Sequence, residues 1–220
     1  STSRGLGDVY KRQQKNRKRW IILQIGGTIV YGIGTYRKEL SMGHVYFTRH
    51  GQTIWNVERK ICGATDVELT ELGYTQAQEL GEKIKKEGYG IDEILYSPLI
   101  RAEQTAKTIS KVTGIPARAE ERLREQCFGK YEGTPRRGEE FQEAKLHFID
   151  SYQGGETMLK LAQRIYNLLD DVKAESENKT YLLVAHNGIA RVIQSYFEDM
   201  TNEEYAGFGI RNCQIVEYRF

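Results

Sequence analysis

Short apolar runs of strand character alternate along this chain with longer stretches of helical period, and this alternation restricts the possible folds more than any other feature. The runs that predict strands cover residues 44–48, 91–96, 118–123, 181–185 and 214–218. The amphipathic stretches that predict helices cover residues 72–86, 97–112, 157–174 and 190–197, with a short helix expected near 139–146. Strands that alternate with helices favour an α/β fold, here a three-layer α/β/α sandwich with a mostly parallel central sheet.

Residues at the ends of these stretches support the helix predictions. Thr70 is a candidate N-cap for the helix over 72–86. Ser97 and Pro98 predict the start of the next helix, with the serine as N-cap and the proline in the first helical position. Gly114 predicts its end, because glycine readily adopts the left-handed conformation that terminates many helices.

Residues 1–41 differ from the rest of the chain in charge. They hold nine of the 32 Lys and Arg residues and two of the 30 Asp and Glu residues, which leaves 23 basic and 28 acidic residues in 42–220. A basic run at 15–19 precedes a glycine-interrupted apolar stretch at 20–34. That stretch has fifteen residues, whereas a membrane-spanning helix needs about 20.

Two interpretations of residues 1–41 are open. The basic and apolar parts have the order of a signal peptide or anchor, but no small-residue cleavage site follows them. The favoured interpretation is a non-native leader or cloning scar, with Met42 as the natural start. Residues 1–41 are then expected to lack fixed structure, and residues 42–220 form the single functional domain.

Composition argues against several classes of function. The mild acidic excess of residues 42–220 does not indicate nucleic acid as a partner, and no membrane partner is expected. Cys62, Cys127 and Cys213 lie far apart without a CxxC pair, so no zinc site of the usual spacing is expected. Scattered cysteines in odd number are typical of reduced thiols and predict a cytoplasmic protein. The sequence leaves the oligomeric state open.

Two histidines and two arginines fall where α/β sheets bind ligands. His50 and His186 each follow a predicted strand, and ligands sit at the carboxyl ends of strands in open α/β sheets. Arg49 adjoins His50, and Arg101 falls in the first turn of a predicted helix. Free N–H groups at a helix start favour anions, and a guanidinium group matches phosphate oxygens. Either histidine alone would be weak support, but the four residues together predict an anion site.

These residues belong to a series of motifs that resembles the histidine phosphatase superfamily, also called the phosphoglycerate-mutase-like family. The motifs are RHGQTIWN at 49–56, LTELG at 69–73, YSPLIRA at 96–102, LREQCFG at 123–129, GGET at 154–157 and VAHNG at 184–188. An RHG tripeptide alone would be weak support, but the series stands in the order of the family. The resemblance covers residues 43–220 and implies the phosphoglycerate-mutase-like fold.

The resemblance implies a role for each matched residue. His50 would attack phosphorus and carry the phosphoryl group, and Glu125 would protonate the leaving oxygen and later deprotonate the attacking water. The implied phosphate-binding residues are Arg49, Arg101, His186 and Asn56. Glu125 stands among many acidic residues and is singled out by its motif alone.

Physical chemistry agrees with these implied roles. Negative charge on the transferring phosphoryl group calls for fixed cations, and an imidazole nucleophile must present a neutral nitrogen. The chain is therefore expected to be a phosphoric monoester hydrolase of the histidine acid phosphatase type. It would act on a small phosphorylated metabolite with no metal and no cofactor.

Two other functions are open at this stage. A phosphoglycerate mutase that depends on a bisphosphorylated cofactor would share the site around His50, but mutases of this type tend to be longer and to cover the site. The segment 128–152 is polar and glycine-dotted, so we expect a mobile, wet rim and water as the acceptor. A non-catalytic phosphate-binding module is disfavoured because no matched residue is lost. The substrate cannot be predicted, because specificity depends on loops.

Overall fold

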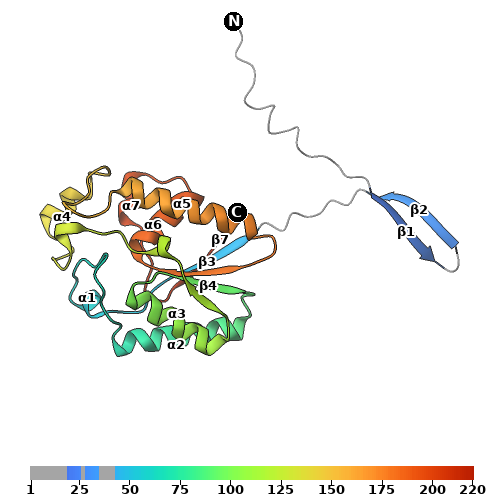
Figure 1. Cartoon of the computed structure of the whole chain (residues 1–220), viewed down its shortest axis with the longest axis horizontal. Coiled ribbons are helices and arrows are strands. Elements are labelled where there is room, and N and C mark those ends of the chain that lie inside the picture. Colours follow the sequence, from blue (N-terminus) through green and yellow to red (C-terminus); the bar gives the residue numbers. More distant parts are fainter. Residues whose placement is uncertain (1–18, 26–27, 35–42) are drawn as a thin grey trace, which may run out of the picture. The chain divides into compact units, whose positions relative to one another are not determined.

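Residues 43–220 form a five-stranded sheet that is covered by helices on both faces (Figure 1). The computed structural model describes residues 19–25, 28–34 and 43–220. The five strands are β3 (His44–Arg49), β4 (Glu93–Tyr96), β5 (Ala117–Ala119), β6 (Tyr181–Ala185) and β7 (Ile215–Arg219). They lie in the order β5-β4-β6-β3-β7, and every neighbouring pair is parallel except β3 and β7. The predicted mostly parallel sheet is confirmed.

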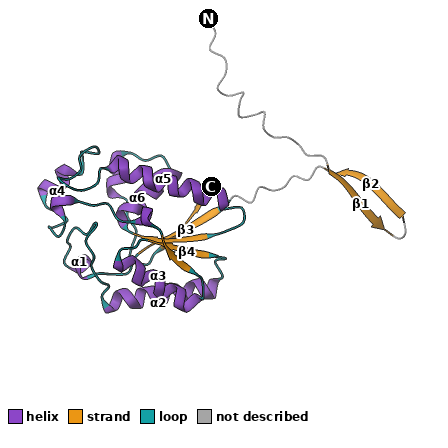
Figure 2. Cartoon of the chain, viewed as in Figure 1, coloured by secondary structure: helices purple, strands orange, loops and turns teal. Residues whose placement is uncertain are grey.

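Each face of the sheet packs against two long helices. These helices are α2 (Glu71–Glu87), α3 (Ile100–Thr113), α5 (Met158–Glu175) and α6 (Asn187–Phe197). Leu182 and Val184 of β6 belong to an apolar cluster with α2 and α3, whereas Leu183 and Ala185 belong to one with α5 and α6. Figure 2 shows the two helical layers on either side of the sheet. The three-layer sandwich is confirmed, and burial on both faces explains why β6 is an unbroken apolar run.

The predicted ends of the helices are correct at two positions and wrong at a third. The Thr70 hydroxyl caps α2, and Gly114 ends α3 in the left-handed conformation with φ 79°. The prediction that Ser97 is the N-cap of the second helix is wrong, because α3 begins only at Ile100. The Ser97 hydroxyl instead lies 2.7 Å from His186 Nε2, so this serine contributes to the site.

Shorter elements connect these layers. They are α1 (Ile54–Val57), the 3₁₀ helices η1 (Glu121–Leu123) and η2 (Gly129–Tyr131), α4 (Glu139–Ala144) and α7 (Asn202–Gly207). The short helix predicted near 139–146 is confirmed as α4, and the strand predicted over 118–123 is split between β5 and η1. Helices α1 and α7 were not predicted, because four and six residues are too few to show a helical period.

The segment 128–152 is only partly the open rim that the sequence indicates. Tyr131, Phe141 and Tyr152 are buried together with Ile61 in a third apolar cluster. The prediction of a wet rim is wrong for these residues, because isolated aromatic residues separated by charged ones carry no recognisable period. Residues 146–150 are exposed, as predicted.

Residues 1–41 form a unit separate from residues 42–220. Within it, β1 (Arg19–Ile25) and β2 (Thr28–Gly34) pair as an antiparallel hairpin. The expectation that residues 1–41 lack fixed structure stays a prediction, and the rest of the segment lies outside the described residues. Its origin as a leader or scar stays a prediction. Among the described helices, none has the length and apolar character needed to cross a membrane.

Candidate active site

The register between β3 and β6 places the two predicted histidines side by side. Arg49 pairs with Ala185 in this parallel ladder, so His50 and His186 each occupy the next position along their chains. The His50 N–H donates to the Ala185 carbonyl oxygen at 2.9 Å. The centroids of the two imidazole rings lie 5.2 Å apart. Both strand-end histidines therefore belong to one site.

The surroundings of His50 favour a neutral ring with one free nitrogen. Its Nδ1 lies 2.7 Å from the carbonyl oxygen of Gly51, which can only accept a hydrogen bond. The proton of the neutral ring is thereby held on Nδ1, and Nε2 keeps its lone pair. Burial, followed by the charges of Arg101 and Arg49, lowers the pKa of His50 well below 6.5. The ring is thus uncharged near neutral pH and has the form that a nucleophile needs.

The turn after His50 is held by close backbone packing. A Cβ atom on Gly51 would lie 2.4 Å from the carbonyl oxygen of Gly73 in α2, so a larger residue would force the two segments apart. The Gly51 N–H donates to the hydroxyl of Thr105 in α3 at 3.0 Å. The glycine of the RHG motif therefore allows the turn after His50 to contact both helices of one layer.

Backbone carbonyl groups orient the two predicted arginines. Arg101 is fully buried, and its terminal nitrogens donate to the carbonyl oxygens of Thr65 and Gly63 at 2.9 and 2.7 Å. Arg49 donates from Nη1 to the carbonyl oxygen of Ile210 at 3.2 Å. Burial and the nearby charge of Arg136 lower the pKa of Arg49 to about 10, which still leaves the guanidinium charged at neutral pH. Among the described residues, neither arginine forms an ion pair with a carboxylate.

Three buried nitrogen atoms have no hydrogen-bond partner among the described residues. They are Nε of Arg49, Nε of Arg101 and Nδ1 of His186. An unpartnered buried polar group costs about 1–3 kcal/mol, so three of them beside His50 are not explained by stability. Such groups fit a site built to surround an anion.

His186 is oriented by a serine from the neighbouring strand end. Its Nε2 lies 2.7 Å from the Ser97 hydroxyl, and Ser97 follows β4. Burial, with the charge of Arg101 second, lowers the pKa of His186 well below 6.5. The side chain is therefore a neutral hydrogen-bonding group at neutral pH.

Glu125 is held at the start of α6 by two backbone amides. Its carboxyl oxygens accept from the N–H groups of Gln126 and Gly188, each at 2.9 Å. A Cβ atom at position 188 would lie 2.4 Å from Glu125 Oε1, so only glycine permits this approach. The side chain is buried, with 6% of its residue surface exposed. Burial raises the pKa of Glu125 above 4.5, although the two amide hydrogen bonds oppose the rise.

Asn56 and Asn212 are hydrogen-bonded to each other beside His50. The Asn56 Oδ1 accepts from the Thr53 N–H and from Asn212 Nδ2, each at 3.2 Å. Because its oxygen already accepts two hydrogen bonds, Asn56 has its side-chain amino group available as a donor. Asn212 Nδ2 also donates to the His50 carbonyl oxygen at 2.7 Å. Sequence analysis missed Asn212, because it follows no recognised motif.

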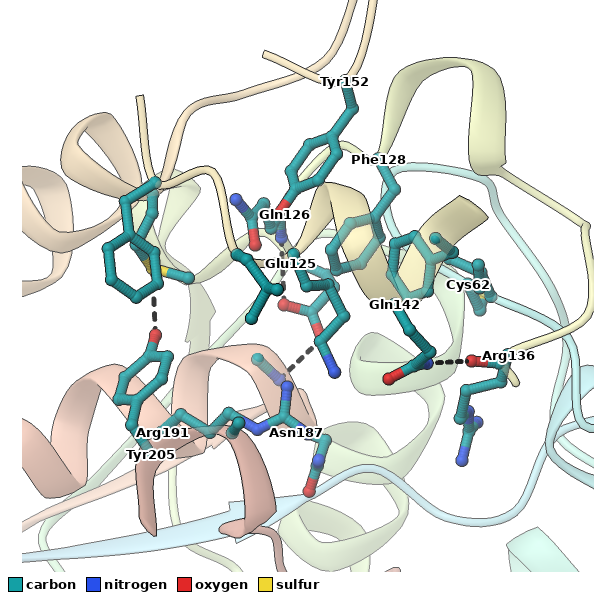
Figure 3. Close-up of a pocket in the computed structure, with 18 of the residues that line it drawn as sticks. Cys62, Glu125, Gln126, Phe128, Arg136, Gln142, Tyr152, Asn187, Arg191 and Tyr205 are labelled. Atoms are coloured by element: carbon teal, nitrogen blue, oxygen red, sulfur yellow. Dashed lines mark hydrogen bonds between the residues drawn. The ribbon is translucent and has the colours of Figure 1, made fainter. Parts of the chain in front are cut away.

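One cavity connects these groups. It has a volume of about 370 Å³, and its lining includes Arg49, His50, Asn56 and Glu125. Arg101 and His186 are buried and are not part of this lining. Figure 3 shows the part of this cavity around Glu125, with Asn187 and Arg191 from α6 on one side. All six residues predicted from the sequence are thus gathered at or directly beside one cavity, whereas their individual roles stay predictions.

Within the described residues, no group of three or more His, Cys, Asp or Glu side chains is arranged to hold a metal ion. Cys62 lines the cavity, and burial raises the pKa of its thiol to about 11. All three cysteines are free.

Similarity to known proteins agrees with the site. The sequence profile of the histidine phosphatase superfamily (branch 1) matches residues 45–220. The "Probable phosphoglycerate mutase GpmB" of Yersinia pestis (strain Pestoides F) is 30% identical over 187 residues, which cover 81% of this chain and 86% of that protein.

Solved structures show the same likeness. The mycobacterial glucosyl-3-phosphoglycerate phosphatase superposes with a TM-score of 0.68 at 28% identity, covering 80% of this chain and 90% of that one. YhfR of Bacillus stearothermophilus has a TM-score of 0.67 at 29% identity, covering 79% and 89% of the two chains. On the match of the profile, the fold and the paired strand-end histidines, this chain belongs to the histidine phosphatase superfamily.

Proposed function

We propose that the chain hydrolyses small phosphomonoesters through a phosphohistidine on His50. The observation that supports this most directly is the pairing of a neutral imidazole with a buried carboxyl group of raised pKa on one cavity. Two charged guanidinium groups stand beside them. The cavity therefore offers a nucleophile, a proton donor and fixed positive charge, which are the needs of phosphoryl transfer.

Two steps complete the proposed reaction. In the first, His50 Nε2 forms a bond to phosphorus, the bond from phosphorus to the ester oxygen breaks, and protonated Glu125 gives its proton to the leaving alcohol. In the second, Glu125 takes a proton from water while the water oxygen bonds to phosphorus and the bond to Nε2 breaks. Inorganic phosphate leaves, and both side chains return to their starting forms. Arg49, Arg101, His186 and Asn56 would hold the phosphoryl oxygens throughout.

The exposed mouth of the cavity favours transfer of the phosphoryl group to water over its transfer to a phosphoglycerate. Leu146 lines the cavity and is 67% exposed, and Gln142 beside it is exposed as well. A mutase must shield its phosphorylated intermediate from water until the substrate has reoriented. The exposed mouth supports hydrolysis, although the buried cluster around Tyr131 makes the segment less open than its composition indicates.

Phosphate release tests this proposal. The full-length chain should release inorganic phosphate from p-nitrophenyl phosphate and from alkyl phosphomonoesters in excess EDTA, because the arginines supply the positive charge. His50→Ala should reduce turnover to background, and the trapped phosphoprotein should be labile to acid, as phosphohistidine is. His147→Ala is the matched control, since the His147 side chain is exposed, lies beside Glu143 and does not line the cavity.

Two outcomes would replace the proposal. Interconversion of 2- and 3-phosphoglycerate much faster than phosphate release would assign the chain as a mutase. Phosphate binding without turnover on any substrate would assign it as a non-catalytic module.

A further inference from the structure

The cavity carries three basic side chains that the phosphoryl chemistry does not use. Arg136 comes from the segment before α4, Lys145 directly follows α4, and Arg191 comes from α6. Glu125 is the one acidic residue among the described residues that line the cavity. Its two carboxyl oxygens accept from the backbone N–H groups of Gln126 and Gly188, and no described ion pair joins it to these cations.

No carboxylate neutralises these cations within the part of the chain that is described. Lysine and arginine residues elsewhere in the domain form ion pairs with acidic neighbours, as Arg122 does with Glu120. The Arg191 Nε donates to the Phe208 carbonyl oxygen at 2.8 Å, which orients the guanidinium without cancelling its charge. Lys145 contacts the Phe141 ring, with its Nζ 5.8 Å from the ring centroid.

The three cations are close enough to disfavour one another's charge. The pKa of Lys145 is lowered by desolvation and then by Arg191 and Arg136. Desolvation and then Arg191 lower the pKa of Arg136. Three like charges gathered without a counter-charge are costly in the unliganded protein, and an anion between them would relieve that cost.

An apolar wall lies in the same cavity. Its aromatic and aliphatic members are Phe128, Phe141, Leu146, Phe148, Tyr152, Met158 and Tyr205. In Figure 3, Arg191 and Arg136 lie on opposite sides of Glu125, with Phe128 and Tyr152 above it. One cavity thus offers a phosphoryl-transfer end, an apolar wall and a second positively charged region.

We propose that Arg136, Lys145 and Arg191 form a subsite for a second anionic group on the leaving alcohol of the substrate. The preferred substrate is then a phosphomonoester whose organic part has an apolar face against the aromatic wall and carries a carboxylate or a second phosphate. This inference rests on the proposed function, since it concerns the alcohol part of the hydrolysed ester. The phosphate at His50 and the second anion occupy the same cavity at the same time.

A matched substrate series tests the subsite. The three compounds are phenyl phosphate, the O-phosphate of 3-(4-hydroxyphenyl)propionate, and the methyl ester of that acid. The acid and its ester have leaving groups of nearly equal basicity and differ chiefly in one remote charge. The kcat/KM ratio of acid to ester should be about 10 to 100, the range for one or two charge-assisted hydrogen bonds. A phosphonate in place of the carboxylate distinguishes the two kinds of anion.

Variants that remove one positive charge test whether the preference for the acid over the ester comes from these residues. Arg136→Gln and Lys145→Gln should each lower the acid-to-ester ratio by about threefold to tenfold, and the double variant should lower it further than either change alone, with Arg191 retaining the preference that remains. The ratio is the readout because a loss of folded protein or of common catalytic power cancels in it. Arg137→Gln is the matched control, since Arg137 is exposed, adjoins Arg136 and does not line the cavity. Its ratio should equal that of the unaltered chain.

Binding separates a failure of this inference from a failure of the proposed function. Calorimetric titration of the His50→Ala chain with acid and ester gives the same ratio without turnover. An equal affinity for both compounds would overturn the subsite, even if phosphate release is normal. A preference for the acid that Arg136→Gln and Lys145→Gln leave intact would overturn it as well. Preferential binding of the acid without any hydrolysis by the unaltered chain would retain the subsite and reject the hydrolase.

Discussion

Burial biases His50 and Glu125 in the same direction, towards the neutral form, although one is a base and the other an acid. Desolvation lowers the pKa of the imidazole and raises the pKa of the carboxyl group. A neutral nucleophile and a protonated acid are the two states that the first chemical step needs together. Burial therefore favours the required protonation state of both side chains.

These shifts predict an activity that extends to acid pH. His50 stays neutral as the pH falls below 6.5, because its pKa is lowered, and Glu125 stays protonated above 4.5, because its pKa is raised. The kcat/KM ratio of an alkyl phosphate to p-nitrophenyl phosphate should therefore fall as the pH rises through the pKa of Glu125. Measurement of both substrates from about pH 4 to about pH 9 checks this, once each profile is corrected for the second ionisation of its own phosphate group. A loss of activity below pH 6.5 that follows protonation of one histidine would contradict it.

Glu125→Gln should separate substrates by their leaving groups. Glutamine keeps one of the two oxygens that accept from Gln126 and Gly188, and its amide cannot transfer a proton to the alcohol. We expect kcat/KM to fall roughly 10²–10⁴-fold for an alkyl phosphate and much less for p-nitrophenyl phosphate, whose leaving group needs little protonation. Equal losses on the two substrates would assign proton transfer to another group.

What the sequence could predict about the site follows from the motifs. His50, His186, Arg49 and Arg101 stand out because their residue types fall at strand ends and at a helix start. Asn212 and the contact between Ser97 and His186 could not be predicted, because both depend on tertiary packing between segments distant in sequence. The three cations of the outer cavity could likewise not be predicted, because charged residues are frequent throughout the sequence.

Among the elements, α6 has the most direct influence on chemistry. Its first turn supplies the Gly188 N–H to Glu125, and Arg191 lies one turn further along. The prediction of this helix over 190–197 missed its first turn, which begins at Asn187. Asparagine and glycine have weak helix propensity, so the pattern did not extend to the turn that contacts the acid.

Gly188→Ala should mimic the loss of the acid while leaving the fold intact. The added Cβ would lie 2.4 Å from Glu125 Oε1 and must displace that carboxyl group. We expect kcat/KM for an alkyl phosphate to fall on the order of 10²-fold, the scale for a displacement of about 1 Å, with a smaller loss for p-nitrophenyl phosphate.

Gly207→Ala is the matched control for this change, because a Cβ atom there meets nothing within 4 Å. It should leave both rates unchanged. Thermal unfolding of the two variants shows whether the loss comes from the site or from stability. Normal alkyl phosphatase activity in Gly188→Ala would show that the contact is dispensable.

At the scale of the whole molecule, the residue before β3 is hydrogen-bonded to the residue after β7. The Gly43 carbonyl oxygen accepts from the Phe220 N–H at 2.9 Å, and β3 begins at His44. The unit of residues 1–41 holds a hairpin of its own. We therefore propose that this segment is dispensable for the activity.

A chain that starts at Met42 should retain both stability and activity. We expect kcat/KM within about twofold of the full chain and an unfolding midpoint within about 2 °C, since a midpoint shift of about 4 °C corresponds to roughly 1 kcal/mol in a domain of this size. A chain that starts at Thr48 is the control, because it loses most of β3 and should not fold. A large drop in the midpoint of the Met42 chain would show that the hairpin packs on the domain.

The ladder between β3 and β6 fixes the distance between His50 and His186. Neighbouring strands lie about 4.8 Å apart, and the imidazole centroids of His50 and His186 lie 5.2 Å apart. The hydrogen bonds of the ladder fix both this spacing and the register of the two strands, and a one-residue slip in register would turn every side chain of the strand to the opposite face. The segments that line the outer cavity have no such constraint. Loops of different length and charge could therefore change the substrate that the fold accepts without changing the distance between His50 and His186.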